Sequence, residues 1–148
     1  MTADFQMVLE RVAVGSAIND SKDFSDALEA AGIEYVVDCQ GEHDDTPFLV
    51  TQNMLDCWCP TMDDGQPKPL EWWGKGIGWA LEQYAKPHAK IYFHCAAGVN
   101  RGPSMCFGFM LALGFDAATA EALIRKARPQ VGIAYKQDAI DKVPQLGY

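Results

Sequence analysis

The sequence predicts an α/β fold, in which helices flank a central, mostly parallel sheet, and two observations carry that prediction. β-rich segments alternate with segments of helical periodicity, and a helical tail follows them. The 148 residues are 49% hydrophobic and contain no repeat and no linker. This length suits one hydrophobic core, so we expect a single domain over residues 1–148.

Four short segments have the composition of strands. They are rich in β-branched and aromatic residues, and glycine, proline or acidic residues bound them. The expected strands are Arg11–Ile18, Ile33–Val37, Met54–Cys59 and Lys90–Phe93. Polar loops follow the second and the third of them: the acidic Gly41–Thr46, and the proline-rich Pro60–Pro69 with its two adjacent aspartates.

Helices are expected where apolar residues recur at helical spacing or where capping residues mark an end. Ser21 is a suitable N-cap and Gly32 a suitable stop for the first helix. Pro103–Leu113 is apolar almost all round, which predicts a central buried helix. The expected helices cover residues 22–31, 70–84, 103–113, 117–127 and 135–142.

The net charge of −8 argues against a nucleic-acid partner, because phosphate backbones are bound by clustered lysine and arginine side chains. It still allows a local basic pocket that holds a single phosphate. No apolar run approaches the roughly 20 residues that span a bilayer, and residues 1–10 lack the pattern of a signal peptide. We therefore expect a cytoplasmic protein with no membrane partner, and the oligomeric state stays open.

The five cysteines do not suggest a disulfide framework, because their number is odd and no secretion signal is visible. Cys57 and Cys59 are separated by one residue, but a second ligand pair at zinc-knuckle spacing is missing. We therefore expect two strand cysteines on opposite faces, no metal site and no organic cofactor.

The most informative segment is residues 91–104, IYFHCAAGVNRGPS. A strand ends at His94–Cys95, a short loop follows, and a helix begins near Gly102–Pro103. This arrangement points backbone N–H groups into one concavity at the positive end of a helix dipole, which is a cradle for a tetrahedral oxyanion. Gly98 allows a tight turn, and Arg101 adds a planar cation that matches two phosphate oxygens.

Cys95 stands at the head of this cradle. The N–H groups that hold a phosphate would also stabilise the Cys95 thiolate. A thiolate beneath a bound phosphate is placed for in-line attack on phosphorus. The alternative is a buried strand-end cysteine beside an unrelated surface arginine, but it does not account for the glycines or for the strand-to-helix context.

His94–Cys95, five residues and then Arg101 resemble the signature loop of the cysteine-based protein tyrosine phosphatase superfamily. The short chain and the loop interior AAGVN are most similar to the dual-specificity branch, and the likeness runs from about Arg11 to Leu146. The resemblance implies hydrolysis of phosphotyrosine, and of phosphoserine or phosphothreonine, through a phosphocysteine intermediate on Cys95. It assigns His94 a supporting role. The implied phosphate-binding residues are Ala96, Ala97, Gly98, Val99, Asn100 and Arg101.

The leaving alkoxide or phenoxide needs a proton, and a carboxylic acid on a movable loop suits that task. The resemblance implies an aspartate on a loop that follows a strand, upstream of the nucleophile. Asp63 and Asp64 lie in that window. Asp63 is favoured and Asp64 is the alternative, while a solvated acidic turn would explain both without catalysis. Met62 departs from the Trp-Pro-Asp pattern of the tyrosine-specific branch, so that branch is disfavoured.

One position departs from the family's pattern. The family usually has serine or threonine directly after the arginine, where the hydroxyl stabilises the thiolate that leaves the phosphocysteine. This chain has Gly102 there, and Ser104 lies two residues further on. The departure predicts slow turnover with accumulation of phosphoenzyme. It also makes a phosphate-binding module with weak catalysis, a pseudophosphatase, the main alternative function.

Cys39 ends the β-rich segment around EYVVD, where strand ends gather near the cradle. Some relatives, including inositol-lipid phosphatases, have a cysteine at a similar place that forms a disulfide with the nucleophile. A reversible Cys39–Cys95 disulfide is therefore a hypothesis for redox protection. A core cysteine without a partner is the simpler explanation.

The substrate is expected to be a phosphorylated protein or another phosphomonoester. The loop interior has no lysine, whereas phosphoinositide-selective relatives often have basic residues there. The acidic residues 42–45 would also repel a polyanion if they lie near the mouth of the site. The basic segment 125–137 is expected on a solvated helix face, with steering of a phosphoprotein as the alternative. Arg101 and the buried helix after it disfavour a sulfurtransferase-like use of the cysteine loop.

Overall fold

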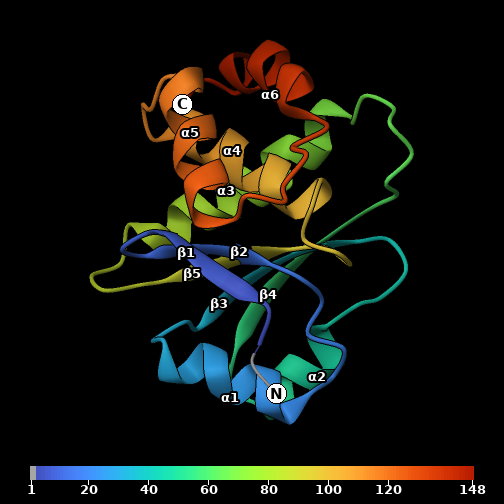
Figure 1. Cartoon of the computed structure of the whole chain (residues 1–148), viewed down its shortest axis with the longest axis vertical. Coiled ribbons are helices and arrows are strands. Elements are labelled where there is room, and N and C mark those ends of the chain that lie inside the picture. The colour runs from blue at the N-terminus through green and yellow to red at the C-terminus, as the bar shows by residue number, and fades with distance from the viewer. Residues whose placement is uncertain (1–2) are drawn as a thin grey trace.

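The computed structural model describes residues 3–148, which form a five-stranded sheet with helices on both faces (Figure 1). The strand order is β1-β2-β5-β3-β4. The first two strands pair antiparallel and all other neighbours are parallel. The strands are β1 (Phe5–Leu9), β2 (Val12–Gly15), β3 (Tyr35–Gln40), β4 (Leu55–Thr61) and β5 (Ile91–His94). The predicted α/β fold with a mostly parallel sheet is confirmed.

The helices divide between the two faces of the sheet (Figure 1). One face is covered by α3 (Leu70–Tyr84), α4 (Arg101–Ala112), α5 (Ala117–Ala127) and α6 (Lys136–Lys142), and a 3₁₀ turn over Val143–Leu146 follows. The other face is covered by α1 (Lys22–Ala30) and α2 (Thr46–Thr51). None of the helices in residues 3–148 is long and apolar enough to cross a membrane.

Strand side chains alternate between two hydrophobic clusters, because successive residues of a strand point to opposite faces. Ile91 and Phe93 of β5 enter the larger cluster with α3–α6, whereas Tyr92 enters the smaller cluster with α1 and α2. All three are fully buried. β5 is thus a central strand with both faces covered, and its packing fixes where the following loop starts.

The predicted helices agree with the structure more closely than the predicted strands do. The helices over 70–84 and 117–127 have the expected bounds, and the Ser21 side chain accepts a hydrogen bond from the Phe24 N–H as the N-cap of α1. Helix α4 begins at Arg101, two residues before the expected start. The sequence pattern misses β1 and α2. The six residues of α2 are too few to show a helical period, and β1 depends on its pairing with β2.

The prediction that Cys57 and Cys59 lie on opposite faces is wrong. The two residues are two positions apart in β4, and side chains at that spacing share a face. Both are buried, and their Sγ atoms are 3.6 Å apart. All five cysteines lie in the described part of the chain and all are free thiols.

Candidate active site

The candidate site lies at the carboxyl end of β5, where the chain passes through residues 95–100 into α4. Cys95 directly follows the strand and is 3% exposed, and Arg101 is the first residue of the helix. The predicted strand–loop–helix arrangement is therefore present, with the thiol beneath the N-terminus of a twelve-residue helix. Such an end attracts anions, because its first N–H groups have no intrahelical partner.

The loop between Cys95 and Arg101 turns tightly at Gly98, which has φ +70°. A Cβ at this position would lie 2.5 Å from the carbonyl carbon of Gly15 at the end of β2. Both the left-handed backbone and the close approach therefore require glycine. The predicted turn is present, and its cause is the contact between this loop and the neighbouring strand end.

Arg128 holds the outer side of the same loop. Its guanidinium is 1% exposed, and it donates from Nε to the Gly98 carbonyl at 2.8 Å and from Nη2 to the Ala97 carbonyl at 3.0 Å. The Asp4 carboxylate pairs with the same guanidinium at 2.8 Å. In a trans peptide unit the N–H points opposite to the carbonyl, so the N–H groups of Gly98 and Val99 point away from Arg128.

The expectation that residues 125–137 form a solvated basic face is wrong for Arg128, whereas the Arg125 side chain is 39% exposed. Arg128 is buried against the loop. Arg125 donates to the Val131 carbonyl at 2.8 Å and to the Glu121 carboxylate at 2.7 Å. Arg128 is therefore not free to steer a substrate. Its partners Asp4, Ala97 and Gly98 lie in other parts of the chain, which the local charge pattern does not disclose.

The Arg101 guanidinium is buried and is gripped along one edge. Nη1 and Nη2 donate to the two carboxylate oxygens of Glu42 at 2.6 and 3.0 Å, and Nη1 also donates to the Thr61 carbonyl at 2.9 Å. The Nε–H is buried and has no hydrogen-bond partner among the described residues. The guanidinium therefore presents a free edge, from Nε to Nη2, that matches two oxygens of a phosphate.

Sequence reasoning missed the role of Glu42, which was expected only to repel polyanions. The hydrogen bonds from Arg101 lower the pKa of the Glu42 carboxyl to about 2, so it is ionised whenever the protein is folded at ordinary pH. Its charge is neutralised by Arg101, and its geometry fixes the guanidinium plane. Only the contact across 59 residues reveals this partnership.

The two candidate general acids face different partners. Asp63 accepts from the Tyr135 hydroxyl at 2.7 Å and from the Asn100 side-chain amide at 3.2 Å, and Asn100 belongs to the signature loop. Asp64 instead accepts from the Lys68 ammonium at 2.9 Å, which lowers the pKa of its carboxyl. Asp63 is thus the member of the pair that lies against the phosphate cradle.

His94 lies at the end of β5 and is fully buried. Its Nε2 lies 2.5 Å from Oδ2 of Asp45, and its Nδ1 lies 3.2 Å from the carbonyl oxygen of Cys95. Burial alone would lower the pKa of His94, but the hydrogen bond to Asp45 and the charges of Asp45 and Asp38 together outweigh it and raise the pKa. This geometry fits the expected supporting role, and Asp45 is a further residue that sequence reasoning missed.

Gly102 and Cys39 both lie close to the nucleophile. A Cβ at position 102 would lie 2.6 Å from the carbonyl carbon of His94, so the first turn of α4 packs directly on the end of β5. Cys39 follows Asp38, which is paired with His94 across the β3–β5 ladder. Cys39 is therefore beside Cys95 on the neighbouring strand. Burial raises the pKa of the Cys39 thiol, and the proximity of Cys95 raises it further.

A comparison of the sequence with models of protein families identifies the class of protein that has this site and fold. The family model for the dual specificity phosphatase catalytic domain matches residues 15–138. The chain therefore belongs to the dual specificity phosphatase family, as its signature loop predicts. A search of the curated proteins found no match.

Solved structures with the same fold include PTPMT1 in complex with PI(5)P, at 16% identity and a TM-score of 0.82 over 97% of this chain and 96% of that one. Human DUSP28 has 15% identity and a TM-score of 0.81 over 100% and 98% of the two chains. The human tyrosine phosphatase-like serine/threonine/tyrosine-interacting protein has 14% identity and a TM-score of 0.79 over 99% and 100%. At these identities the likeness concerns the fold alone.

Proposed function

We propose that this protein hydrolyses phosphotyrosine, and phosphoserine or phosphothreonine, in phosphorylated proteins through a phosphocysteine intermediate on Cys95. The observation that carries the proposal is the free edge of Arg101 beside the buried Cys95 at the N-terminus of α4. Family membership supplies the reaction class, and the oriented guanidinium supplies the group that stabilises charge on the transferred phosphoryl.

In the first step, the Cys95 thiolate attacks phosphorus while loop N–H groups and Arg101 hold the non-bridging oxygens. The Sγ–P bond forms and the bond to the leaving oxygen breaks. Protonated Asp63 donates its proton to that oxygen, so the leaving group departs as a neutral alcohol or phenol. The hydrogen bonds from Tyr135 and Asn100 keep the Asp63 carboxyl at the edge of the cradle.

In the second step, the Asp63 carboxylate takes a proton from water as the water attacks phosphorus. The Sγ–P bond breaks, and inorganic phosphate and the Cys95 thiolate are released. No hydroxyl is present at Gly102 to stabilise that thiolate. Ser104 is fully buried and its Oγ accepts from the Tyr135 backbone N–H at 3.1 Å, but within residues 3–148 it donates no hydrogen bond to Cys95. We therefore propose that this second step limits turnover.

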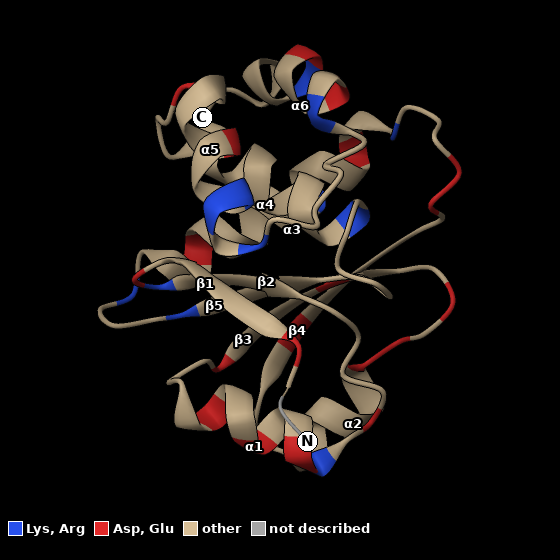
Figure 2. Cartoon of the chain, in the orientation of Figure 1, with Lys and Arg blue, Asp and Glu red and all other residues tan. Residues whose placement is uncertain are grey.

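The surroundings of the site favour a phosphoprotein over a polyphosphorylated lipid. PTPMT1 has been crystallised with PI(5)P, but the signature loop of this chain contributes a single cation, Arg101. Acidic residues lie on the β3–α2 and β4–α3 loops (Figure 2), which carry Glu42 and Asp63 to the cradle. Because Glu42 is paired with Arg101 and Asp64 with Lys68, these two loops add no net positive charge that would attract a second cluster of phosphates. A cytoplasmic location agrees with this substrate and stays a prediction.

The alternative is a phosphate-binding module with vestigial catalysis, and Gly102 is the observation that favours it. The fold also serves a human protein described as phosphatase-like and serine/threonine/tyrosine-interacting. The two candidate functions share phosphate binding by Arg101 and differ in whether phosphate is transferred to Cys95.

The exchange Asp63→Asn is expected to lower kcat for an alkyl phosphate by about 100-fold or more, because the leaving alkoxide loses its proton donor and the water of the second step loses its base. Asp64→Asn is the matched control, since it removes the neighbouring carboxylate and should leave kcat within about twofold. The measurement is steady-state hydrolysis of phosphoserine peptide by both variants. Equal losses in the two variants would contradict the assignment of Asp63.

Mild peroxide is expected to join Cys39 to Cys95. Peroxide oxidises the Cys95 thiolate to a sulfenic acid, and condensation with the Cys39 thiol forms the disulfide and releases water. Dithiothreitol should then restore activity in the wild type. The variant Cys39→Ser should instead lose activity irreversibly, whereas Cys106→Ser should behave as the wild type. If peptide mapping after peroxide treatment finds no Cys39–Cys95 disulfide, the hypothesis of redox protection is wrong.

A further inference from the structure

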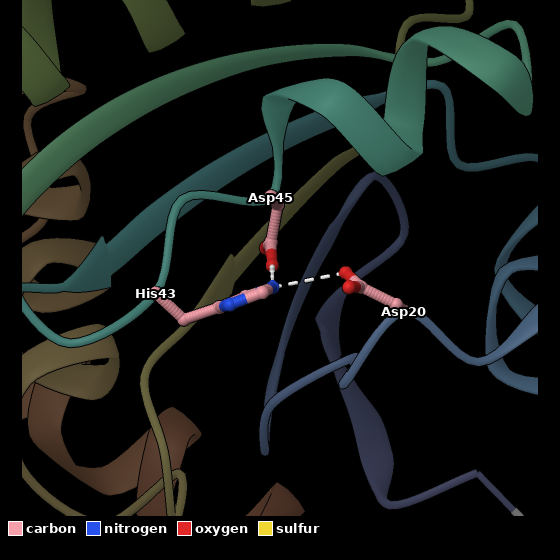
Figure 3. A group of neighbouring side chains, drawn as sticks. All are labelled: Asp20, His43 and Asp45. Carbon is pink, nitrogen blue, oxygen red and sulfur yellow. Dashed lines mark hydrogen bonds and ion pairs between the residues drawn. The ribbon is translucent and has the colours of Figure 1, made fainter.

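Three side chains converge beside the sheet (Figure 3), and two of them, Asp20 and His43, have no part in the phosphatase mechanism. Asp20 comes from the turn before α1, and His43 and Asp45 come from the loop between β3 and α2. The Nε2 atom of His43 lies 2.9 Å from Oδ1 of Asp20 and 3.6 Å from Oδ1 of Asp45. The two carboxylates point toward the imidazole from different segments of the chain.

Asp45 is the unusual member of this group. Its side chain is fully buried, and its Oδ1 atom has no hydrogen-bond partner within residues 3–148. Its other oxygen, Oδ2, is already taken by His94 at 2.5 Å. A buried carboxylate oxygen without a donor is costly, and this one is aimed at the space between His43 and Asp20. The free oxygen therefore points to a cation that the three side chains would share.

We propose that Asp20, His43 and Asp45 form a binding site for a divalent transition-metal ion, with zinc as the best fit. One imidazole nitrogen and two carboxylate oxygens are a donor set that Zn²⁺ accepts, whereas an all-oxygen set would favour Mg²⁺ or Ca²⁺. Donor atoms around a tetrahedral zinc lie about 3.3 Å apart at bond lengths of about 2.0 Å. The observed separations of 2.9 and 3.6 Å bracket that value.

The site is open on one side. Asp45 forms its floor, while the side chains of Asp20 and His43 are 52% and 37% exposed. The ion can therefore enter from solvent and retain water in its fourth position. Among the described residues, the other cluster of this kind is Asp38, Asp45 and His94. It is fully buried and its imidazole nitrogen is already bonded to Asp45, so it offers no such entry.

The proposed ion would be connected to the candidate active site through Asp45. One oxygen of this carboxylate would bind the metal while the other keeps its bond to His94, whose ring contacts the carbonyl of Cys95. Second-sphere contacts of this type orient metal ligands. The same loop carries Glu42, which grips Arg101. Metal binding would thus stiffen the segment that positions both groups.

The test is a titration of the Cys95→Ser protein. Binding of Zn²⁺ is measured by calorimetry, and binding of Co²⁺ is measured by absorption spectroscopy. Removal of the nucleophile prevents zinc from binding at the signature loop. We expect one ion per chain and a cobalt spectrum without a sulfur-to-cobalt charge-transfer band. His43→Gln and Asp20→Asn should each weaken binding at least about tenfold. His88→Gln removes the exposed histidine after α3 and should leave the affinity unchanged.

Three results would overturn the proposal. The first is that zinc does not bind saturably even at millimolar concentration. The second is that His43→Gln leaves the zinc affinity unchanged, and the third is a cobalt spectrum that shows thiolate ligands. Both ligand substitutions are on exposed side chains, so the variants should fold, and far-ultraviolet circular dichroism checks this. Phosphatase activity does not enter the readout, so failure here would leave the proposed function unaffected.

Discussion

Lysine in place of Arg101 is expected to lower kcat/KM for p-nitrophenyl phosphate by roughly 100- to 1,000-fold. The guanidinium uses one edge to bind Glu42 and Thr61 and leaves the other edge for phosphate. A lysine ammonium is a single point of charge and cannot serve both edges in fixed geometry. With Glu42 adjacent and ionised, the ammonium is expected to pair with the carboxylate and leave the phosphate uncontacted.

Arg125→Lys is the matched control for this exchange. Arg125 also pairs with a carboxylate and a backbone carbonyl, but it lies outside the signature loop. The variants are compared by steady-state hydrolysis and by competition with tungstate, which reports on anion binding alone. A loss for Arg101→Lys no larger than that for Arg125→Lys would contradict the role given to the free edge.

Serine at position 102 is expected to destabilise the protein rather than to restore the family's usual turnover. The new Cβ would lie 2.6 Å from the His94 carbonyl carbon and 3.0 Å from the Cys95 nitrogen, and both are backbone atoms with little room to move. Overpacking of this type costs about 1–3 kcal/mol. A shift of the loop that relieves the contact would also displace the N–H groups of the cradle.

Urea unfolding measures this effect. Gly102→Ala and Gly102→Ser should both lose about 1–3 kcal/mol of unfolding free energy, and kcat of Gly102→Ser should not exceed that of the wild type. Gly74→Ala is the control, because a Cβ there would meet only the end of the Leu146 side chain at 3.3 Å within a helix. Alanine is the better helix former, so this variant should be at least as stable. A stable, faster Gly102→Ser would refute the steric argument.

The parts of the site that the sequence predicts are those whose geometry is local. Cys95, the turn at Gly98 and the start of α4 lie within a few residues of one another, so strand, loop and helix signals suffice to place them. The same is true of α3 and α5, whose periodicity extends over several turns.

The parts that the sequence misses depend on contacts between distant segments. Glu42 reaches Arg101 across 59 residues, Asp45 reaches His94 across 49, and Arg128 reaches Gly98 across 30. Each is a charged residue in a polar stretch, where the local pattern predicts only solvation. The strand order brings these segments together, and the sequence of a single segment does not predict that order. The sequence already favours Asp63 over Asp64, and the structural support for that preference is the contact with Tyr135, 72 residues away.

The central claim is that Cys95 accepts the phosphoryl group, and rapid mixing with p-nitrophenyl phosphate at mildly acidic pH tests it most directly. The account predicts a burst of one p-nitrophenol per protein chain, then slow linear release, and neither phase in Cys95→Ser. Trapped phosphoprotein should carry its phosphate on Cys95 by mass mapping. The contrary result would be tungstate binding that depends on Arg101 with no burst and no turnover, which would make the protein a phosphate-binding module.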